Sequence, residues 1–165
     1  MGNTFPCVVF GSFGAFWLSY GATLQPFYNA YGAYIASPQD PVASGLKQPG
    51  FNASFAFFLL FMGVLCFIYM ILALRTNLVF FLIFVTLVPA FSLLAAAFWH
   101  LAEDYEGNAA LAQKEILAAG ALTFVTDMLG WYIFFAIMLA SLDFPFQLPV
   151  VDLTRFVKGA SDKNK

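Results

Sequence analysis

The sequence predicts an all-α membrane protein with four transmembrane helices. Two observations support this fold class: the chain is very apolar, and its charged residues leave long gaps. Hydrophobic residues make up 62% of the 165 residues and charged residues 10%, whereas soluble domains have roughly 45–50% and 25%. A soluble domain of this length has too much surface to hide so many apolar side chains, and disorder requires the opposite composition. The chain therefore belongs in a lipid bilayer.

Four segments are apolar over the length of about 20 residues that a helix needs to cross a bilayer. No Asp, Glu, Lys or Arg precedes Asp40, and the next charge-free stretches are residues 48–74 and 76–102. A further stretch, residues 116–142, contains only Asp127. None of them shows the alternation of apolar and polar residues that is typical of barrel strands. We predict one transmembrane domain, with helices at about residues 5–24, 51–74, 78–101 and 118–142.

Lysine and arginine collect at one end of the predicted bundle. The turn at residues 75–77 and the tail at residues 143–165 lie on the same side, which carries Arg75, Arg155, Lys158, Lys163 and Lys165. The opposite side has two lysines beside Asp40, Glu103, Asp104, Glu106 and Glu115. Because cytoplasmic loops are enriched in Lys and Arg, we expect the tail to be cytoplasmic. The plasma membrane is the expected location.

The chain shows no side-chain pattern of a soluble enzyme or metal site. A single histidine, His100, cannot form a zinc site with Cys7 and Cys66 at their separate depths. Gly11-Ser12-Phe13-Gly14 lacks one flank of a nucleophile elbow. A net charge of −2 without a basic run argues against nucleic-acid binding. We expect no enzymatic activity, no cofactor and no metal, and no glycan on the Asn52-Ala53-Ser54 sequon, which sits at the membrane edge.

Polar groups in the first predicted helix have two interpretations. Gly11, Ala15 and Ser19 form a ridge of small residues, and Ser12 shares the face of Ser19. Such ridges promote close helix packing, which the spacing favours, but with their hydroxyls they can also line a narrow pathway. In the third helix, Pro89 frees the carbonyl of Val85, which Thr86 or Ser92 could satisfy.

Asp127 is the one formal charge well inside a predicted span. An isolated carboxylate in hydrocarbon takes up a proton, because desolvation disfavours its charged form. One interpretation of Asp127 is a proton-coupling or ion-binding group. The other is a neutral aspartic acid that is hydrogen-bonded to Thr123 or to a neighbouring helix. The sequence does not separate these roles. His100, close to Glu103 and Asp104, is expected at the outer mouth of its helix.

Several motifs, in order along nearly the whole chain, resemble the acetate uptake transporter family, which includes bacterial succinate–acetate permeases and fungal acetate or ammonia transporters. They are Gly2-Asn3-Thr4-Phe5, the run from Phe10 to Leu18, Phe55-Ala56-Phe57-Phe58, Leu74-Arg75-Thr76-Asn77, Val79-Phe80-Phe81 and Gly130-Trp131-Tyr132. The tail from Asp143 to Val150 is similar to the fungal branch in particular.

The resemblance implies that these are helices three to six of a six-helix protomer in a hexameric ring. It implies proton-coupled transport of acetate or similar small monocarboxylates through a pathway in each protomer. The family's Asn-Pro-Ala-Pro-Leu-Gly motif and first two spans have no counterpart here, so the chain is similar to the last two thirds of a transporter. The alternatives are a non-transporting subunit that assembles with full-length relatives and, more weakly, transport of ammonium or ammonia.

The resemblance also implies a hydrophobic constriction in the pathway. A tyrosine of the family's constriction corresponds to Phe13 here, and a leucine corresponds to Leu93 or Leu94. A small carboxylate crosses an apolar neck cheaply when hydroxyls and amides replace its water, or as the neutral acid. The groups expected to line the route are Asn3, Thr4, Ser12 and Ser19, with Phe13 and Leu93 or Leu94 as the gate.

Overall fold

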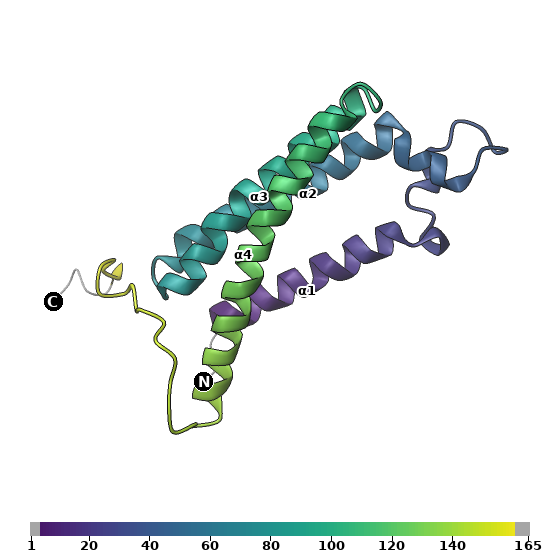
Figure 1. The fold of residues 1–165 in the computed structure, drawn as a ribbon. Helices are drawn as coiled ribbons and strands as arrows, with labels where there is room; N and C mark the ends of the chain where they lie inside the picture. The colour runs from purple at the N-terminus through teal and green to yellow at the C-terminus, as the bar shows by residue number, and fades with distance from the viewer. Residues whose placement is uncertain (1–3, 161–165) are drawn as a thin grey trace.

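The computed structural model has four long helices, α1 (Thr4–Leu24), α2 (Pro49–Ala73), α3 (Leu78–Glu103) and α4 (Ala109–Ser141) (Figure 1). The structure describes residues 4–160, and within this range no strand is present. All four helices are long and apolar enough to cross a membrane. The predicted fold class is confirmed.

Helix α4 begins earlier than the sequence predicts. It starts at Ala109 instead of near residue 118. The added turns contain Gln113, Lys114 and Glu115, which suit a helix but not the interior of a bilayer. Hydropathy therefore marks where the helix enters lipid and not where it begins. With 33 residues, α4 is about 50 Å long, well beyond the roughly 30 Å hydrocarbon core.

The starts of α2 and α3 follow from local sequence. Pro49 occupies the first turn of α2, where a missing N–H costs nothing. Asn77 caps α3, and its side-chain oxygen accepts a hydrogen bond from the Phe80 N–H at 3.0 Å. The short turn between these helices makes them antiparallel neighbours.

Helices α2, α3 and α4 form the packed part of the bundle, in which α3 contacts both others along its length. At Gly63 of α2, a Cβ atom would lie 3.1 Å from Cβ of Phe91, so glycine permits the close approach of α2 and α3. Helix α1 lies apart from them and diverges from α2 toward their connection (Figure 1).

Side chains, not close backbone packing, hold α1 to the other helices. Near the start of α1, the Phe5 ring lies edge-on to the rings of Phe80 and Phe84, with centroids 5.5 and 6.3 Å away. About two turns further along α1, the Tyr69 hydroxyl of α2 donates a hydrogen bond to Ser12 Oγ at 3.2 Å. These contacts leave the opposite face of α1 open.

Three short 3₁₀ helices shape the connection between α1 and α2: η1 (Pro26–Tyr28), η2 (Gly32–Tyr34) and η3 (Val42–Lys47). Asn52 of α2 is buried beneath them, and its side-chain amide donates hydrogen bonds to the carbonyls of Leu46 at 2.9 Å and Gln48 at 3.0 Å. The sequon nitrogen is therefore engaged in the fold. Asn52 ties the connection to the first turn of α2.

We expect Asn52→Ala to lower the free energy of unfolding by about 1–3 kcal/mol, because it removes two side-chain hydrogen bonds and leaves the Leu46 carbonyl without its buried donor. Thermal unfolding in detergent measures the loss. Gln48→Ala is the matched control, since it also removes an amide side chain but keeps the carbonyl that Asn52 uses. Equal stability of the two variants would contradict this role of Asn52.

The tail after α4 returns to the turn between α2 and α3. The Leu78 N–H donates to the carbonyl of Val151 at 2.9 Å, and the Leu153 N–H donates to the carbonyl of Thr76 at 3.0 Å. The Tyr132 hydroxyl of α4 donates to the carbonyl of Pro149 at 2.8 Å. The tail and the α2–α3 turn therefore lie at the same end of the bundle. That this end faces the cytoplasm stays a prediction.

Within this tail, hydrogen bonds from the backbone and side chain of Thr154 lower the pKa of Asp152, and the charges of Arg155 and Arg75 act in the same direction. Its contribution to the tail fold is therefore present above the ordinary aspartate pKa of about 3.9 and disappears as the pH falls through the lower folded value. We expect hydrogen exchange of residues 152–157, corrected for the intrinsic rate, to become faster in that acid range. Asp152→Asn should remove the pH dependence, and a persisting dependence in that variant would overturn the assignment.

Candidate functional site

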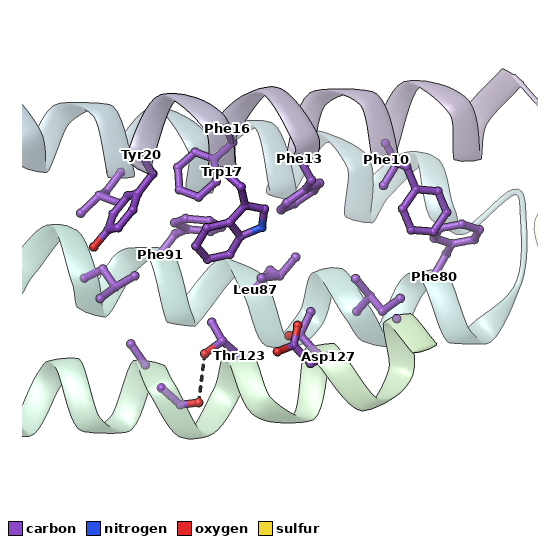
Figure 2. Close-up of a pocket in the computed structure, with 18 of the residues that line it drawn as sticks. Phe10, Phe13, Phe16, Trp17, Tyr20, Phe80, Leu87, Phe91, Thr123 and Asp127 are labelled. Carbon is purple, nitrogen blue, oxygen red and sulfur yellow. Dashed lines mark hydrogen bonds between the residues drawn. The ribbon is translucent and has the colours of Figure 1, made fainter. Parts of the chain in front are cut away.

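A cavity of about 350 Å³ lies between α1, α3 and α4, with Leu59 of α2 at its edge (Figure 2). Its lining is mostly apolar and rich in aromatic rings. The lining residues are Val9, Phe10, Phe13, Phe16, Trp17, Tyr20, Leu59, Phe80, Ile83, Leu87, Phe91, Leu94, Ile116, Ala119, Gly120, Thr123, Thr126, Asp127 and Gly130.

The polar groups of the cavity come mainly from α4. Figure 2 shows Thr123 and Asp127 on α4 directed toward the space that faces the aromatic residues of α1. The Thr123 hydroxyl donates to the carbonyl of Gly120 at 2.9 Å and keeps its lone pairs for a ligand. The Tyr20 side chain reaches the same space from α1.

Asp127 is the only charged residue in the described lining. Its side chain is exposed at the opening of the cavity between α1 and α4, next to a smaller hollow bounded by Phe10, Trp131 and Phe134. Among residues 4–160, no hydrogen bond or ion pair of the carboxylate is found. The cavity thus combines an apolar wall with a carboxylate that has hydrogen-bonding capacity to spare.

The structure brings two of the predicted gate residues to this cavity. Phe13 of α1 and Leu94 of α3 both line it. Leu93, the alternative to Leu94, does not, because neighbouring residues on a helix point about 100° apart. Asp127 lies in the same cavity.

The predicted polar lining residues of α1 lie elsewhere. Ser12 faces α2, where it accepts the Tyr69 bond and donates to the carbonyl of Val9 at 2.9 Å. Ser19 lines a separate pocket toward the α1–α2 connection. Thr4 is the first residue of α1 and is not part of the lining. Asn3 lies outside the described residues.

Two interhelical contacts beside the cavity escaped the sequence analysis. Thr86 of α3 and Thr126 of α4 share a hydrogen bond, with their hydroxyl oxygens 2.7 Å apart. Thr86 also contacts the carbonyl of Ile83 at 2.9 Å, and Ser92 donates to Val88 at 2.8 Å. Neither hydroxyl therefore satisfies the carbonyl that Pro89 frees. Thr86 directly follows Val85, whose carbonyl Pro89 frees, and Thr126 directly precedes Asp127. These positions are the sequence signal that could have identified the pair.

The second contact joins the end of α3 to the early turns of α4, near the connection between these helices. His100 Nδ1 lies 3.0 Å from a carboxylate oxygen of Glu115. The sequence placed His100 near Glu103 and Asp104 on its own helix. The actual partner is on α4, because α4 begins early enough to bring Glu115 alongside.

Four membrane-length helices, three of which enclose a cavity at the depth of the spans, define an integral membrane protein. Residues 1–155 match the GPR1/FUN34/yaaH family. The chain belongs to this family, as the resemblance implied.

Curated fungal relatives share this sequence over most of the chain. Protein alcS of Aspergillus fumigatus is 45% identical over 156 residues, which are 94% of this chain and 56% of the relative. Acetate transporter protein patA of Penicillium expansum is 36% identical over 131 residues, 79% of this chain and 47% of the relative. The chain thus spans about half the length of the curated relatives it matches. No solved structure matched it.

Proposed function

We propose that the chain forms the greater part of a transporter for acetate or a similar small monocarboxylate, with the cavity between α1, α3 and α4 as its binding site. The observation that carries this proposal is a carboxylate with free hydrogen-bonding capacity in a mostly apolar cavity at membrane depth. Family membership and the name of the acetate transporter patA support the substrate class. The protein is then not an enzyme.

The charge of the cavity favours transport of one proton with each carboxylate. No cation is present in the described lining, so an acetate anion finds no counter-charge and meets the Asp127 carboxylate instead. An acetate anion beside the Asp127 carboxylate would place two like charges in one apolar space, and a proton that enters with the substrate removes that repulsion. Asp127 is the proposed proton-coupling group.

The gate in this proposal is the apolar neck between Phe13 and Leu94. Tyr20 and Thr123 supply hydroxyls that replace water around the carboxyl group on the way to Asp127. Asn3, Thr4, Ser12 and Ser19 remain proposed participants in the wider route.

The test is uptake of radiolabelled acetate into vesicles that contain the purified chain, with an inward proton gradient. Phe13→Ala widens the neck, and we expect the ratio of butyrate to acetate uptake to rise about fivefold, since two methylenes then fit. Phe124→Ala, on an exposed side of α4, is the matched control. Equal ratios in both variants would remove Phe13 from the gate.

A second function has one observation in its favour. The cavity opens between α1 and α4, where Asp127 is exposed, and a further protein segment there would cover the carboxylate. A non-transporting subunit that assembles with full-length relatives would fit this opening. Vesicles with the chain alone that take up no acetate, together with co-purification of a full-length relative, would favour this function.

We also propose a homohexamer in the plasma membrane with the tail in the cytoplasm. The uneven distribution of Lys and Arg supports the orientation, and the family resemblance supports the assembly. Labelling of single cysteines at residue 158 and at residue 106 from either side of the membrane tests the topology, and crosslinking tests the hexamer.

A further inference from the structure

A second, smaller pocket of about 260 Å³ lies on the other side of α1, between α1, α2 and the connection that joins them. Its lining combines hydroxyl groups with aromatic rings. The residues are Ser19, Thr23, Ala30, Tyr34, Phe51, Ser54, Phe55 and Phe58. Stacking of Phe58 on Phe16, with centroids 5.2 Å apart, separates this pocket from the larger cavity.

Polarity in this pocket changes with depth. Thr23 lies beside the end of α1, and Ser54 lies about 8 Å along α2 from its first residue. Phe58 lies about 14 Å along α2, where the wall is aromatic. Phe51 adds one aromatic ring near the start of α2, but the hydroxyls of the pocket all lie near the helix ends and its deepest wall is aromatic. This is the same order as the parts of a membrane lipid.

The hydroxyls retain hydrogen-bonding capacity for a ligand. Tyr34 donates to Ser54 Oγ at 3.3 Å, which leaves the proton of Ser54 available. Thr23 donates to the carbonyl of Ser19 at 2.9 Å. The Ser19 hydroxyl has no hydrogen-bond partner among residues 4–160, so it can both donate and accept.

The aromatic wall is rigid, and its Phe55 and Phe58 rings meet at an interplanar angle of 36°. The rings of Phe51 and Phe55 stack with an interplanar angle of 11° and centroids 5.6 Å apart, and Phe51 and Phe55 are buried. Phe58 is held by its stack on Phe16 at 17°. A rigid flat ligand packs on such a wall without losing the conformational entropy that a flexible acyl chain loses.

We propose that this pocket binds a sterol, with the sterol hydroxyl at Ser19 and Ser54 and the ring system against Phe55 and Phe58. None of the described residues that line it is charged, so the phosphate of a phospholipid finds no counter-charge there. A single neutral hydroxyl on a flat apolar body matches both parts of the lining. The Phe16–Phe58 stack separates this site from the carboxylate cavity.

Photocrosslinking in phosphatidylcholine nanodiscs tests the proposal, with a diazirine-bearing cholesterol as the probe and the whole chain as the target. We expect labelled peptides within residues 19–23 and 51–58 and competition by unlabelled cholesterol. Epicholesterol, whose hydroxyl points to the other face, should compete about fivefold less well, because it loses one hydrogen bond of about 1 kcal/mol.

Ser19→Ala and Ser54→Ala should each weaken cholesterol competition about fivefold, whereas Ser92→Ala on α3, the matched control, should leave it unchanged. Labelling outside these segments, equal competition by epicholesterol, equal competition by dioleoylglycerol, or unchanged competition in both serine variants would each overturn the proposal. Thermal unfolding of each variant without cholesterol shows that the fold is retained.

Discussion

Asp127→Asn is expected to lower proton-driven acetate uptake about tenfold or more. Asparagine has nearly the shape of aspartate and can still bind a carboxylate through its N–H₂ group, but it cannot accept or release a proton. If the proton that accompanies the substrate is shared with Asp127, acetate uptake in the variant is no longer coupled to proton entry, although the cavity itself is retained. The remaining uptake should no longer rise as the external pH is lowered.

Asp143→Asn is the matched control, because it makes the same change in an exposed residue beyond the end of α4. Its backbone has a positive φ of 50°, which asparagine adopts readily. Uptake is measured in vesicles between pH 5 and pH 8 with equal amounts of each variant. An Asp127→Asn variant with the pH profile of the control would show that Asp127 only stabilises the cavity.

The number and approximate position of the helices could be predicted because charge is so costly in hydrocarbon that its absence alone marks a span. The same reasoning misplaced the start of α4. Gln113, Lys114 and Glu115 continue the helix beyond the bilayer, where charge no longer carries information about secondary structure. Hydropathy shows which part of a helix lies in the bilayer, but it does not show how far the helix extends beyond the bilayer.

The faces of the helices were harder to predict. These spans are apolar on every side, so no amphipathic pattern shows which face meets protein and which meets lipid. The family resemblance indicated Phe13, which lines the cavity. It left Leu93 and Leu94 as alternatives, and only the structure shows that Leu94 is the one that lines the cavity. Ser12 was expected on the route because its hydroxyl could replace water around a carboxylate, but this hydroxyl bonds to Tyr69 of another helix. Which residues of two helices meet depends on how each helix is rotated about its own axis. The spacing of residues along one helix does not determine that rotation.

Phe84→Ala is expected to lower the free energy of unfolding by about 3 kcal/mol, and its main effect should be on α1. Phe84 is completely buried, and its ring contacts Phe5 of α1 at 6.3 Å and Tyr69 of α2 at 5.5 Å. In a bilayer, burial against protein brings no hydrophobic gain over lipid, so the loss comes from the cavity left behind and from the lost ring contacts. Because α1 depends on such contacts, this helix should detach first.

Phe61→Ala is the matched control, since that residue on α2 is 66% exposed. Unfolding by titration with a denaturing detergent measures both variants, and a crosslink between cysteines on α1 and α2 reports whether α1 stays docked. We expect Phe61→Ala to stay within about 0.5 kcal/mol of the parent chain. Equal losses of unfolding free energy in the two variants would contradict this role of Phe84. They would mean that lipid compensates for the lost Phe84 contacts as fully as for the loss of an exposed ring. In that case α1 would have to be held in place by its Ser12–Tyr69 hydrogen bond and by the contacts of Phe16.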